Sequence, residues 1–415
     1  MMGKIKALYG LPKDVIFCKK CVISNQRPSS TVEFKSTIKD KKQVIMFDED
    51  GICAACAFQN EKNNTIDWNQ REKLLQQLCD KYRKNDGSYD VLIPGSGGKD
   101  SGFQAHLLKY KYGMNPLSVT WSPHLYTDIG LQNFNNWIHI GGFDNFLYTP
   151  NGRLHRLLTK LAFKNLLHPF QPFIVGQKQI GPLMASKFGI KFIMYGEAGT
   201  ENGNNLSKEE NIQGGARQTM HQKYFSQSQD KLDITIGGVK ISDIIKNHGF
   251  KLGDFKSYIP MNASEYNNID VHYLSYYLKW DPQEAYYYAS ENTGFCGNTE
   301  RTVGTYSKYS SIDDKIDYFH WYTTLIKFGL GRASYDAAQE IRTGKITREE
   351  GQLLVKRYDD EFPQKYLQDF LEYIGISEDE FNQTIDSFRS PHIWGKDTLG
   401  NWKLNHNVNK NGLKD

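Results

Sequence analysis

The sequence lacks the features that mark membrane-spanning, secreted and repeat proteins. It contains no run of about 18 apolar residues, so no membrane span is expected. The first 17 residues, MMGKIKALYGLPKDVIF, hold no apolar segment long enough for a signal peptide. Internal repeats and low-complexity tracts are absent too. We therefore expect a cytoplasmic enzyme, whose six cysteines are reduced thiols or metal ligands rather than disulfides.

A strong excess of either charge is also missing. The 51 lysines and arginines and the 47 aspartates and glutamates leave a net charge of +4. So small a net charge argues against nucleic acid as the main partner, although a local basic groove is still compatible with it. The length of 415 residues is enough for a large buried core and predicts two or three domains.

Hydrophobic patterns divide the chain into three predicted domains. Residues 1–66 are rich in turn residues and carry four of the six cysteines. Residues 67–260 alternate short apolar runs with helical periodicity, which predicts an α/β fold with a doubly wound parallel sheet covered on both faces. The pattern over residues 261–415 predicts a helix-rich region, which we expect to bind the substrate or a partner. The strands expected in the sheet are 89–94, 115–122, 143–150 and 190–196.

Four cysteines stand in two pairs near the N-terminus, Cys18-Lys-Lys-Cys21 and Cys53-Ala-Ala-Cys56. A gap of two residues lets both sulfurs of a pair face one ion from a tight turn, and two such turns complete a tetrahedron. Four thiolates suit Zn²⁺, and a closed shell of sulfurs leaves no open position for catalysis. The pattern predicts a structural zinc ribbon. An Fe–S cluster, a redox dithiol and four unrelated buried cysteines are the alternatives.

The stretch 91-VLIPGSGGKDSGFQAHLLKYKYG-113 places a glycine-rich turn between an apolar run and a helical pattern. It does not complete the P-loop pattern G-x-x-x-x-G-K-[ST], because Ile93 stands at the first glycine position and Asp100 follows Lys99. It does not complete the dinucleotide fingerprint G-x-G-x-x-G either, because position 100 is not glycine. Kinase-like phosphoryl transfer and nicotinamide binding therefore both lose support.

The same stretch still has the features of an anion site. A strand ends at Pro94, small residues let the backbone approach a phosphate, and the N–H groups and dipole of the helix that begins near Ser101 favour negative charge. Ser96 and Ser101 can donate hydroxyl hydrogen bonds, and Lys99 adds a positive charge. Asp100 would repel a bare phosphate, so we expect it to cap the helix or to meet Mg²⁺. A merely structural glycine turn is the alternative.

The run Ser96-Gly97-Gly98-Lys99-Asp100-Ser101 resembles the S-G-G-x-D-S signature of the PP-loop ATP pyrophosphatases. That family includes GMP synthetase, asparagine synthetase, argininosuccinate synthetase and several tRNA-modifying enzymes. As in the family, the signature follows a strand of a predicted parallel sheet. The resemblance implies that these residues hold the pyrophosphate of ATP while a substrate oxygen attacks the α-phosphate. A nitrogen or sulfur nucleophile then displaces AMP.

Three further stretches resemble one particular group within this family. FCKKCVISNQRPSS (17–30) precedes the loop, YGEAGTENG (195–203) follows it, and GTYSKYSSIDDKIDYFHWYTTLIKFGLGRASYDAAQEIRTGKITREEG (304–351) lies farther on. Together they look like the N-acetyl sugar amidotransferases of bacterial surface-polysaccharide and flagellin-glycan biosynthesis, over about residues 18–363. The resemblance implies conversion of a sugar acetamido group to an acetamidino group, with ATP, Mg²⁺ and a structural Zn²⁺.

In the implied reaction, the acetamido oxygen attacks ATP to give an O-adenylyl imidate and pyrophosphate, and ammonia then displaces AMP. A carbonyl oxygen is a weak nucleophile, so positioning and neutralisation of the phosphates must supply most of the rate. Lys99 and Asp100, with Mg²⁺, would stabilise the departing pyrophosphate. Glu197, at the end of a later strand, would hold Mg²⁺ or orient ammonia. An ordinary surface carboxylate is the alternative for Glu197.

The resemblance also implies an adenine site at the ends of the strands. Thr120 and Trp121 would line it with Gly196 nearby, and Trp121 would stack on the base or else belong to the core. Several residues are candidates for binding an acidic or nucleotide-linked sugar, because an arginine fork fits carboxylates and phosphates. Each of them alone is equally consistent with a solvated or helix-surface position. These candidates are Arg217, Tyr306, Lys308, Tyr309, Lys315, Arg332 and Arg342.

We expect the chain to take its ammonia from another protein. A class II glutaminase needs an N-terminal nucleophilic cysteine, whereas this chain starts with two methionines. The run TGFCGN around Cys296 departs from the class I pattern G-x-C-x-G, because Asn298 replaces the last glycine. Related amidotransferases pair with a glutaminase subunit and a barrel subunit like those of imidazole glycerol phosphate synthase. The resemblance therefore implies the same two partners as the source of ammonia.

Two other functions stay open at the level of the sequence. A tRNA-thiolating PP-loop enzyme with paired cysteines is the first, although no further cysteine near the loop is available to deliver sulfur. A sugar- or nucleotide-binding regulator without turnover is the second, although Ser96, Asp100 and Ser101 are all present. Release of AMP with a sugar, with tRNA or not at all would distinguish the three.

Overall fold

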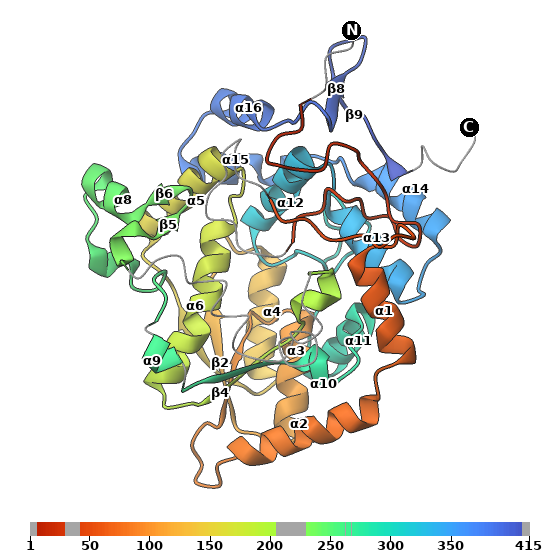
Figure 1. The fold of residues 1–415 in the computed structure, drawn as a ribbon. Helices are drawn as coiled ribbons and strands as arrows, with labels where there is room; N and C mark the ends of the chain where they lie inside the picture. The colour runs from red at the N-terminus through yellow and green to blue at the C-terminus, as the bar shows by residue number, and fades with distance from the viewer. Residues whose placement is uncertain (1–5, 30–41, 205–229, 262, 267, 409–415) are drawn as a thin grey trace.

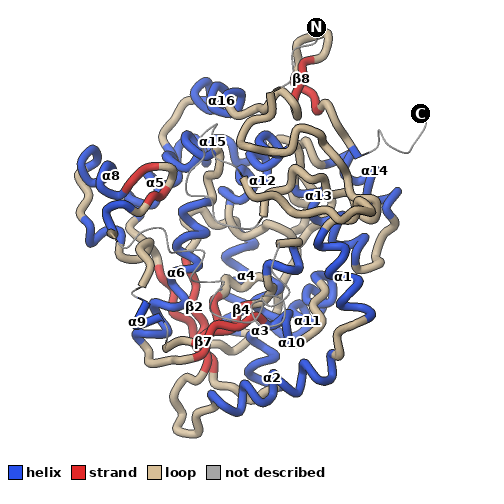
Figure 2. The backbone as a smooth tube through the Cα atoms, in the orientation of Figure 1, coloured by secondary structure: helices blue, strands red, loops and turns tan. Residues whose placement is uncertain are grey.

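The computed structural model describes residues 6–29, 42–204, 230–261, 263–266 and 268–408. Its centre is a five-stranded sheet whose strands gather in the lower half of Figures 1 and 2. The strands run in the order β3-β2-β1-β4-β7, and every neighbouring pair is parallel. The strands of this sheet are β1 (Val91–Pro94), β2 (Pro116–Trp121), β3 (Asp144–Tyr148), β4 (Phe192–Tyr195) and β7 (Asp270–Tyr273).

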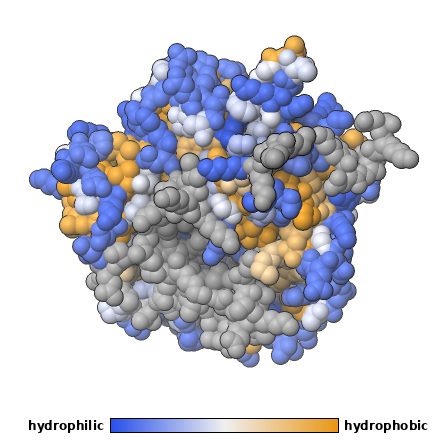
Figure 3. Space-filling model, turned by 45° about the horizontal axis from the view of Figure 1, so that its top comes forward, coloured by the Kyte–Doolittle hydropathy of each residue, from blue (hydrophilic) through white to orange (hydrophobic). Residues whose placement is uncertain are grey.

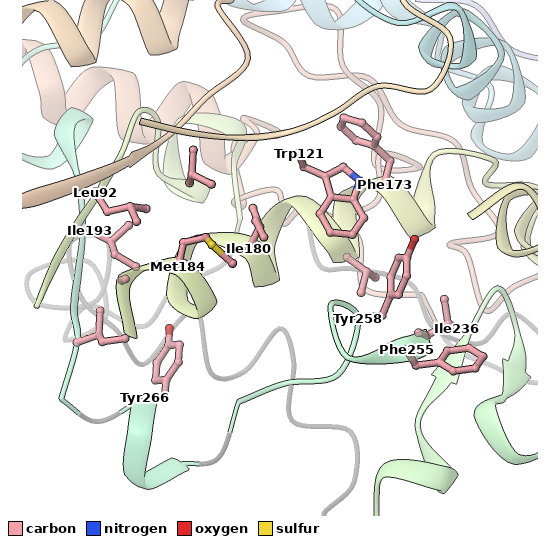
Figure 4. Close-up of a cluster of buried hydrophobic side chains, with 14 of the residues drawn as sticks. Leu92, Trp121, Phe173, Ile180, Met184, Ile193, Ile236, Phe255, Tyr258 and Tyr266 are labelled. Carbon is pink, nitrogen blue, oxygen red and sulfur yellow. The ribbon is translucent and has the colours of Figure 1, made fainter. Parts of the chain in front are cut away.

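Side chains alternate between the two faces of the sheet, as they must along a strand. Leu92 of β1 packs toward α5 (Gly152–Leu166) and α6 (Gln171–Lys187), together with Ile193 of β4. Figure 4 shows this core. Ile93, the next residue of β1, belongs to the core on the opposite face. The helices on that face are α2 (Trp68–Tyr82), α3 (Lys99–His106) and α4 (Asp128–His139).

The α/β fold with a doubly wound parallel sheet is thus confirmed. Strand order reverses at β1, which lies between β2 and β4, and ligands of open parallel sheets bind outside the carboxyl ends of the strands at such a point. The glycine-rich stretch begins directly after β1. The fold therefore brings residues 95–101 to the position where this architecture binds ligands.

The sheet extends beyond the boundary predicted at residue 260. Strand β7 pairs with β4, so it is an edge strand of the same sheet. Helix α11 (Pro282–Thr293) then packs on α3, where Ala289 and Thr293 contact Gly102. Local periodicity cannot reveal a strand that joins the sheet after a long excursion, because its partner lies far away in the sequence.

The described N-terminal segment packs on the C-terminal helices. Tyr9 and Leu11 share a core with α12 (Lys315–Phe328), α15 (Leu367–Ile374) and α16 (Glu378–Ser387). The cysteine-bearing segment, red to orange in Figure 1, crosses α13 (Arg332–Arg342) and α14 (Arg348–Tyr358). The first predicted domain is therefore tied to the third by packing.

The remaining elements are short, apart from one helix that follows the cysteines. Two antiparallel hairpins lie outside the main sheet. None of the described helices is both long and apolar enough to cross a membrane. On the face shown in Figure 3, the described residues form a mainly hydrophilic surface with smaller hydrophobic areas. These elements are α1 (Ala54–Asn64), η1 (Leu107–Lys111), η2 (Gly199–Asn202), η4 (Lys231–Asp233), β5 (Thr235–Ile236), β6 (Val239–Lys240), α8 (Ile241–His248), η5 (Leu252–Phe255), α9 (Ala263–Tyr266), α10 (Leu274–Tyr277), η6 (Gln364–Tyr366), β8 (Trp394–Lys396) and β9 (Trp402–Leu404).

Candidate functional site

The four N-terminal cysteines come together as a buried cluster. Their sulfur atoms all lie within 4.8 Å of one another. Cys18 Sγ is 3.9 Å from Cys56 Sγ, and Cys21 Sγ is 3.7 Å from Cys53 Sγ. A tetrahedral ion with bonds of about 2.3 Å to sulfur separates its ligands by about 3.8 Å, so the donor set fits Zn²⁺. Four buried cysteines at this spacing could therefore bind a metal such as zinc.

The electrostatics of the cluster favour a cation at its centre. Hydrogen bonds from the neighbouring thiols, Cys21 first, lower the pKa of Cys18, whereas the interaction with Cys18 raises the pKa of Cys56. The backbone N–H groups of Cys21 and Cys53 also donate to Cys18 Sγ. Four thiolates at these distances repel one another strongly, and a bound divalent ion removes that repulsion.

The glycine-rich loop has a conformation that its glycines make possible. Gly97 has φ +84°, and a Cβ there would lie 2.7 Å from the carbonyl oxygen of Asn133 on α4. A Cβ on Gly95 would lie 2.5 Å from the Cβ of Ser101. Gly98 differs from both, because the nearest atom to a Cβ at that position is 3.9 Å away. The backbone of Gly98 therefore faces open space at the start of α3.

Asp100 is the most extensively bound side chain of the loop. Its Oδ1 accepts a hydrogen bond of 3.0 Å from the indole N–H of Trp280, and its Oδ2 pairs with the ammonium of Lys99. Both side chains are largely buried. A carboxylate that is hydrogen-bonded on one oxygen and ion-paired on the other has a fixed orientation. The structure thus sets Asp100 in place before any ligand arrives.

A cavity of about 230 Å³ lies beside the loop. Ser96, Gly98 and Lys99 line one side of it, and the other side comes from the C-terminal region, with Asp313 and Arg332. The Ser96 hydroxyl bridges the two sides by donating to Asp313 Oδ2 at 3.2 Å. The cavity therefore lies at the interface between the loop and the C-terminal helices.

A second, smaller cleft continues from this cavity. The two hollows share Lys99, Tyr309, Ser310 and Arg332 in their linings. The guanidinium of Arg332 is held by Asp336, with N–O distances of 3.0 and 3.3 Å, and lies over the ring of Trp321 at 4.4 Å. Arg332 is thus a rigid cation at the junction of the two hollows.

The walls of the two hollows contain more acidic residues than residues of the predicted basic group. Burial raises the pKa of Asp313, and the neighbouring Asp317 raises it further. Burial likewise raises the pKa of Asp317. Asp281, Asp336 and Glu340 line the second cleft. Carboxylates so close to a phosphate-type loop would repel an anion unless a cation lies between them.

The predicted residues after β4 lie next to the loop. Gly196 is close to Asp100, since a Cβ on it would lie 3.9 Å from the Asp100 Cβ. Glu197 is exposed to solvent. Desolvation by the surrounding protein raises the pKa of Glu197, and the charge of Asp100 raises it further. The solvent exposure of Glu197 weakens both effects. Glu197 is thus electrostatically coupled to the loop without touching it.

The two residues predicted for adenine lie in buried positions. Thr120 is fully buried and donates to the carbonyl oxygen of Gly95 at 2.7 Å, so it supports the loop from behind. Trp121 is 2% exposed and packs against Gly176, Phe173 and Tyr258 in the core of Figure 4. Of the two positions considered for Trp121, the structure favours the core.

The candidates for sugar binding separate into two groups. Arg332 and Tyr309 line the cavity, whereas Tyr306 donates to Glu340 at 2.8 Å beside the second cleft. Lys308 donates to the carbonyl of Thr299 and Lys315 pairs with Asp369, so these two described members of the basic group do not line the cavity. Arg217 lies outside the described residues.

Two residues at the loop were not predicted from the sequence. Trp280 reaches Asp100 from the segment after β7, and Asp313 reaches Ser96 from 217 positions away. Neither belongs to a motif, and only the packing of the C-terminal helices on the sheet brings them there. An aspartate pair in the quoted stretch GTYSKYSSIDDKID was the available hint.

Comparison with known proteins adds one finding. Residues 303–409 match the family model described as "LPS biosynthesis protein WbpG-like, C-terminal domain". No curated protein matches the chain. The matched segment contains Tyr309, Asp313, Asp317 and Arg332, so it supplies the wall that faces the loop. The C-terminal part of the chain is thus similar to a domain of lipopolysaccharide biosynthesis proteins.

Proposed function

We propose that the chain is an ATP-dependent, AMP-forming amidotransferase that converts the acetamido group of a sugar to an acetamidino group in bacterial surface-glycan biosynthesis. One observation carries the proposal: a loop with the sequence of a pyrophosphate-binding signature and a segment similar to a lipopolysaccharide biosynthesis domain line the same cavity. The loop supplies the nucleotide chemistry, and the C-terminal wall supplies the acceptor site.

The loop suits the pyrophosphate of ATP. Its Gly98 is the residue before α3, and the open space at Gly98 lets phosphate oxygens reach the free N–H groups of the helix start. Lys99 lines the same space and can add its charge. Ser101 donates to the carbonyl of Gly98 at 3.0 Å, which fixes the turn.

Carboxylates around the loop suit Mg²⁺, a hard cation that prefers oxygen ligands. Asp100 and Asp313 would hold it, since both face the cavity. When bound, Mg²⁺ would neutralise charge on the phosphates. The residues of the chain would meanwhile keep Asp100 oriented through Trp280 and keep Asp313 oriented through Ser96.

In the proposed first step the acetamido oxygen forms a bond to the α-phosphorus, and the bond from that phosphorus to the β-bridging oxygen breaks. Pyrophosphate leaves with the electron pair. In the second step ammonia adds to the imidate carbon and AMP leaves with the C–O electron pair, so the oxygen of the amide departs on AMP. Arg332, rigid at the junction of the hollows, would bind an anionic oxygen of the adenylated sugar.

The ammonia is proposed to come from a glutaminase subunit and a barrel subunit. The acidic lining of the second cleft, with Asp281 and Glu340, would attract ammonium to the acceptor. Glu197, on the other side of Asp100, is the proposed group that orients ammonia or binds the metal.

Transfer of sulfur to tRNA requires a reactive thiol near the adenylated substrate. Among the described residues, no cysteine lines either hollow. The four paired cysteines are buried together, and Cys79 is buried in the core behind α3. Cys296 follows Phe295 of the cavity wall, but its thiol donates to the carbonyl of Gly294 at 3.4 Å. Sugar amidation is therefore the better-supported reaction of the two.

The proposal is tested by incubating the purified protein with ATP, Mg²⁺, an ammonium salt and a panel of N-acetylated nucleotide-linked and acidic sugars. Equal amounts of AMP and pyrophosphate are expected, with a product in which NH replaces one oxygen of the sugar. The variant Asp100→Asn should lower AMP formation by about 100-fold or more, as loss of a transition-state charge interaction does. Release of ADP, or AMP only in the presence of tRNA, would refute the proposal.

A further inference from the structure

The described part of the chain contains a further cavity away from the loop. It measures about 540 Å³ and lies between the end of α12, the end of α14 and the β8–β9 hairpin. It shares no lining residue with the two hollows at the loop. Its function is therefore a separate question, and it does not depend on the proposed reaction.

Arg389 is the central charged residue of this cavity. Its side chain is 8% exposed, and its Nε donates to Asp386 at 3.1 Å. The guanidinium also interacts with the hydroxyl of Tyr322. Its Nη1, however, is buried and has no hydrogen-bond partner in the part of the chain that the structure describes. Because this nitrogen is closed to solvent, a ligand would meet the rest of the Arg389 side chain, which lines the cavity.

Two tryptophans fix this arginine and form an apolar wall. The guanidinium carbon lies 4.3 Å from the ring centre of Trp394 and 5.1 Å from that of Trp402. Trp394 is anchored through its N–H, which donates to the carbonyl of Ile326 at 2.7 Å. Trp402, whose ring centre lies 4.8 Å from the ammonium of Lys396, remains 37% exposed on the hairpin, so the exposed part of its ring can contact a ligand ring.

The remaining charges of the cavity favour an oxyanion. Lys356 and Lys403 line it and are exposed at its rim. Asp359 also lines it, but its carboxylate is occupied by the N–H groups of Gly331 and Ser334 and by the Ser334 hydroxyl. Asp360 is the remaining carboxylate of the lining, and it is exposed. The positive side chains therefore outnumber the carboxylates that can face a ligand.

We propose that this cavity binds a sugar that carries an oxyanion, either a carboxylate or a phosphate. Arg389, which lines the cavity, would attract the oxyanion with its charge, and Trp402 would stack on the apolar face of the ring. A planar arginine fork matches both anions, whereas stacking on an indole is typical of ring ligands.

The test is calorimetric titration of the full chain with four probes: glucuronic acid, glucose 1-phosphate, glucose and inorganic phosphate. At least one of the two anionic sugars should bind saturably at millimolar or lower concentration, and glucose should bind at least about tenfold more weakly. Whether the carboxylate or the phosphate sugar binds more tightly identifies the oxyanion. Arg389→Gln should weaken the tighter probe by roughly 10- to 100-fold, the cost of a lost charge-assisted hydrogen bond.

A second variant and a matched control keep the test decisive. Trp402→Ala on the exposed hairpin should weaken binding severalfold even if Arg389→Gln fails to fold. Lys99→Ala should leave it unchanged, which separates this cavity from anion binding at the loop. The proposal is overturned if neither anionic sugar binds, if inorganic phosphate binds as tightly as both sugars, if both Arg389→Gln and Trp402→Ala bind like the parent, or if Lys99→Ala abolishes the signal.

Discussion

The indole N–H of Trp280 donates a hydrogen bond of 3.0 Å to Asp100 in the glycine-rich loop, and the carbonyl of the same residue accepts one of 2.9 Å from Lys62. Lys62 lies on α1, which begins at the second cysteine pair, and forms a buried ion pair of 2.7 Å with Glu201. One residue therefore connects the cysteine segment to the candidate site.

Replacement of Trp280 tests this connection. Trp280→Phe keeps most of the ring but removes the donor to Asp100, so the carboxylate gains rotational freedom. We expect kcat for AMP formation to fall roughly tenfold, equivalent to about 1.4 kcal/mol, with little change in melting temperature. Trp68→Phe, which removes a donor to the carbonyl of Lys62 instead, is the matched control and should retain activity. Equal losses in both variants would contradict a specific role of Trp280.

The ion pair between Lys62 and Glu201 gives a prediction about stability. Burial raises the pKa of Glu201, and Lys62 counteracts that shift. Lys62→Met should lower the free energy of unfolding by about 3–5 kcal/mol, because it leaves a buried carboxylate without its partner. The double variant Lys62→Met/Glu201→Gln should regain a large part of this loss. Denaturant titration of the three proteins measures the difference, and simple additivity would speak against the pairing.

Two neighbouring glycines separate folding from binding in the loop. Gly97→Ala should destabilise the protein by at least about 1–2 kcal/mol, since an alanine there would have a left-handed backbone and contact Asn133. Gly98→Ala should preserve stability, because the added methyl group meets open space, yet it should weaken ATP binding by crowding the phosphate. Thermal unfolding and ATP titration of both variants check this. Unchanged ATP affinity in Gly98→Ala would contradict phosphate binding at this position.

The cysteine cluster predicts a metal that stabilises the fold. Cys18→Ser or Cys53→Ser should lose bound zinc and lower the melting temperature by roughly 10 °C or more. Cys296→Ala is the control, since it lies outside the cluster. Elemental analysis and calorimetry provide the measurement. Full metal content with lost activity would instead indicate redox chemistry.

Lys327 gives a prediction about pH. Burial lowers its pKa to about 7 from 10.5, and Lys42 is a close neighbour. The folded state therefore binds fewer protons than the unfolded state between these values, so stability should rise with pH across this window. Relative to Lys327→Met, the parent should gain about 2–3 kcal/mol between pH 7 and pH 9. Parallel stability curves for the two proteins in denaturant titrations would contradict the shift.

The sequence allowed prediction of features that depend on local spacing. The strand before Gly95 and the helix after Gly98 follow from periodicity and small residues, and the paired cysteines follow from their two-residue gaps. The position of the Trp121 ring could not be predicted from local spacing. An apolar strand residue next to a ligand-binding edge has the same local pattern whether its ring lies in the core or in the site, and only the packing of Gly176 against it distinguishes the two.

The far wall of the cavity could not have been predicted for a related reason. Asp313 and Trp280 reach the loop through tertiary packing, and no motif marks either position. Arg332 belongs to an amphipathic helix pattern that is equally consistent with a solvated face. Its position at the junction of the hollows depends on Asp336 and Trp321, which hold its guanidinium.

The cluster of four cysteines packs against Ala337, Ala338 and Val408, which the ribosome adds hundreds of residues later. A nascent chain thus carries four closely spaced thiols for most of its synthesis without the apolar surface that covers them. During that interval the thiols are open to oxidation and to competing metals. Early zinc capture would protect them, so zinc supply during translation should govern the yield of correctly folded protein.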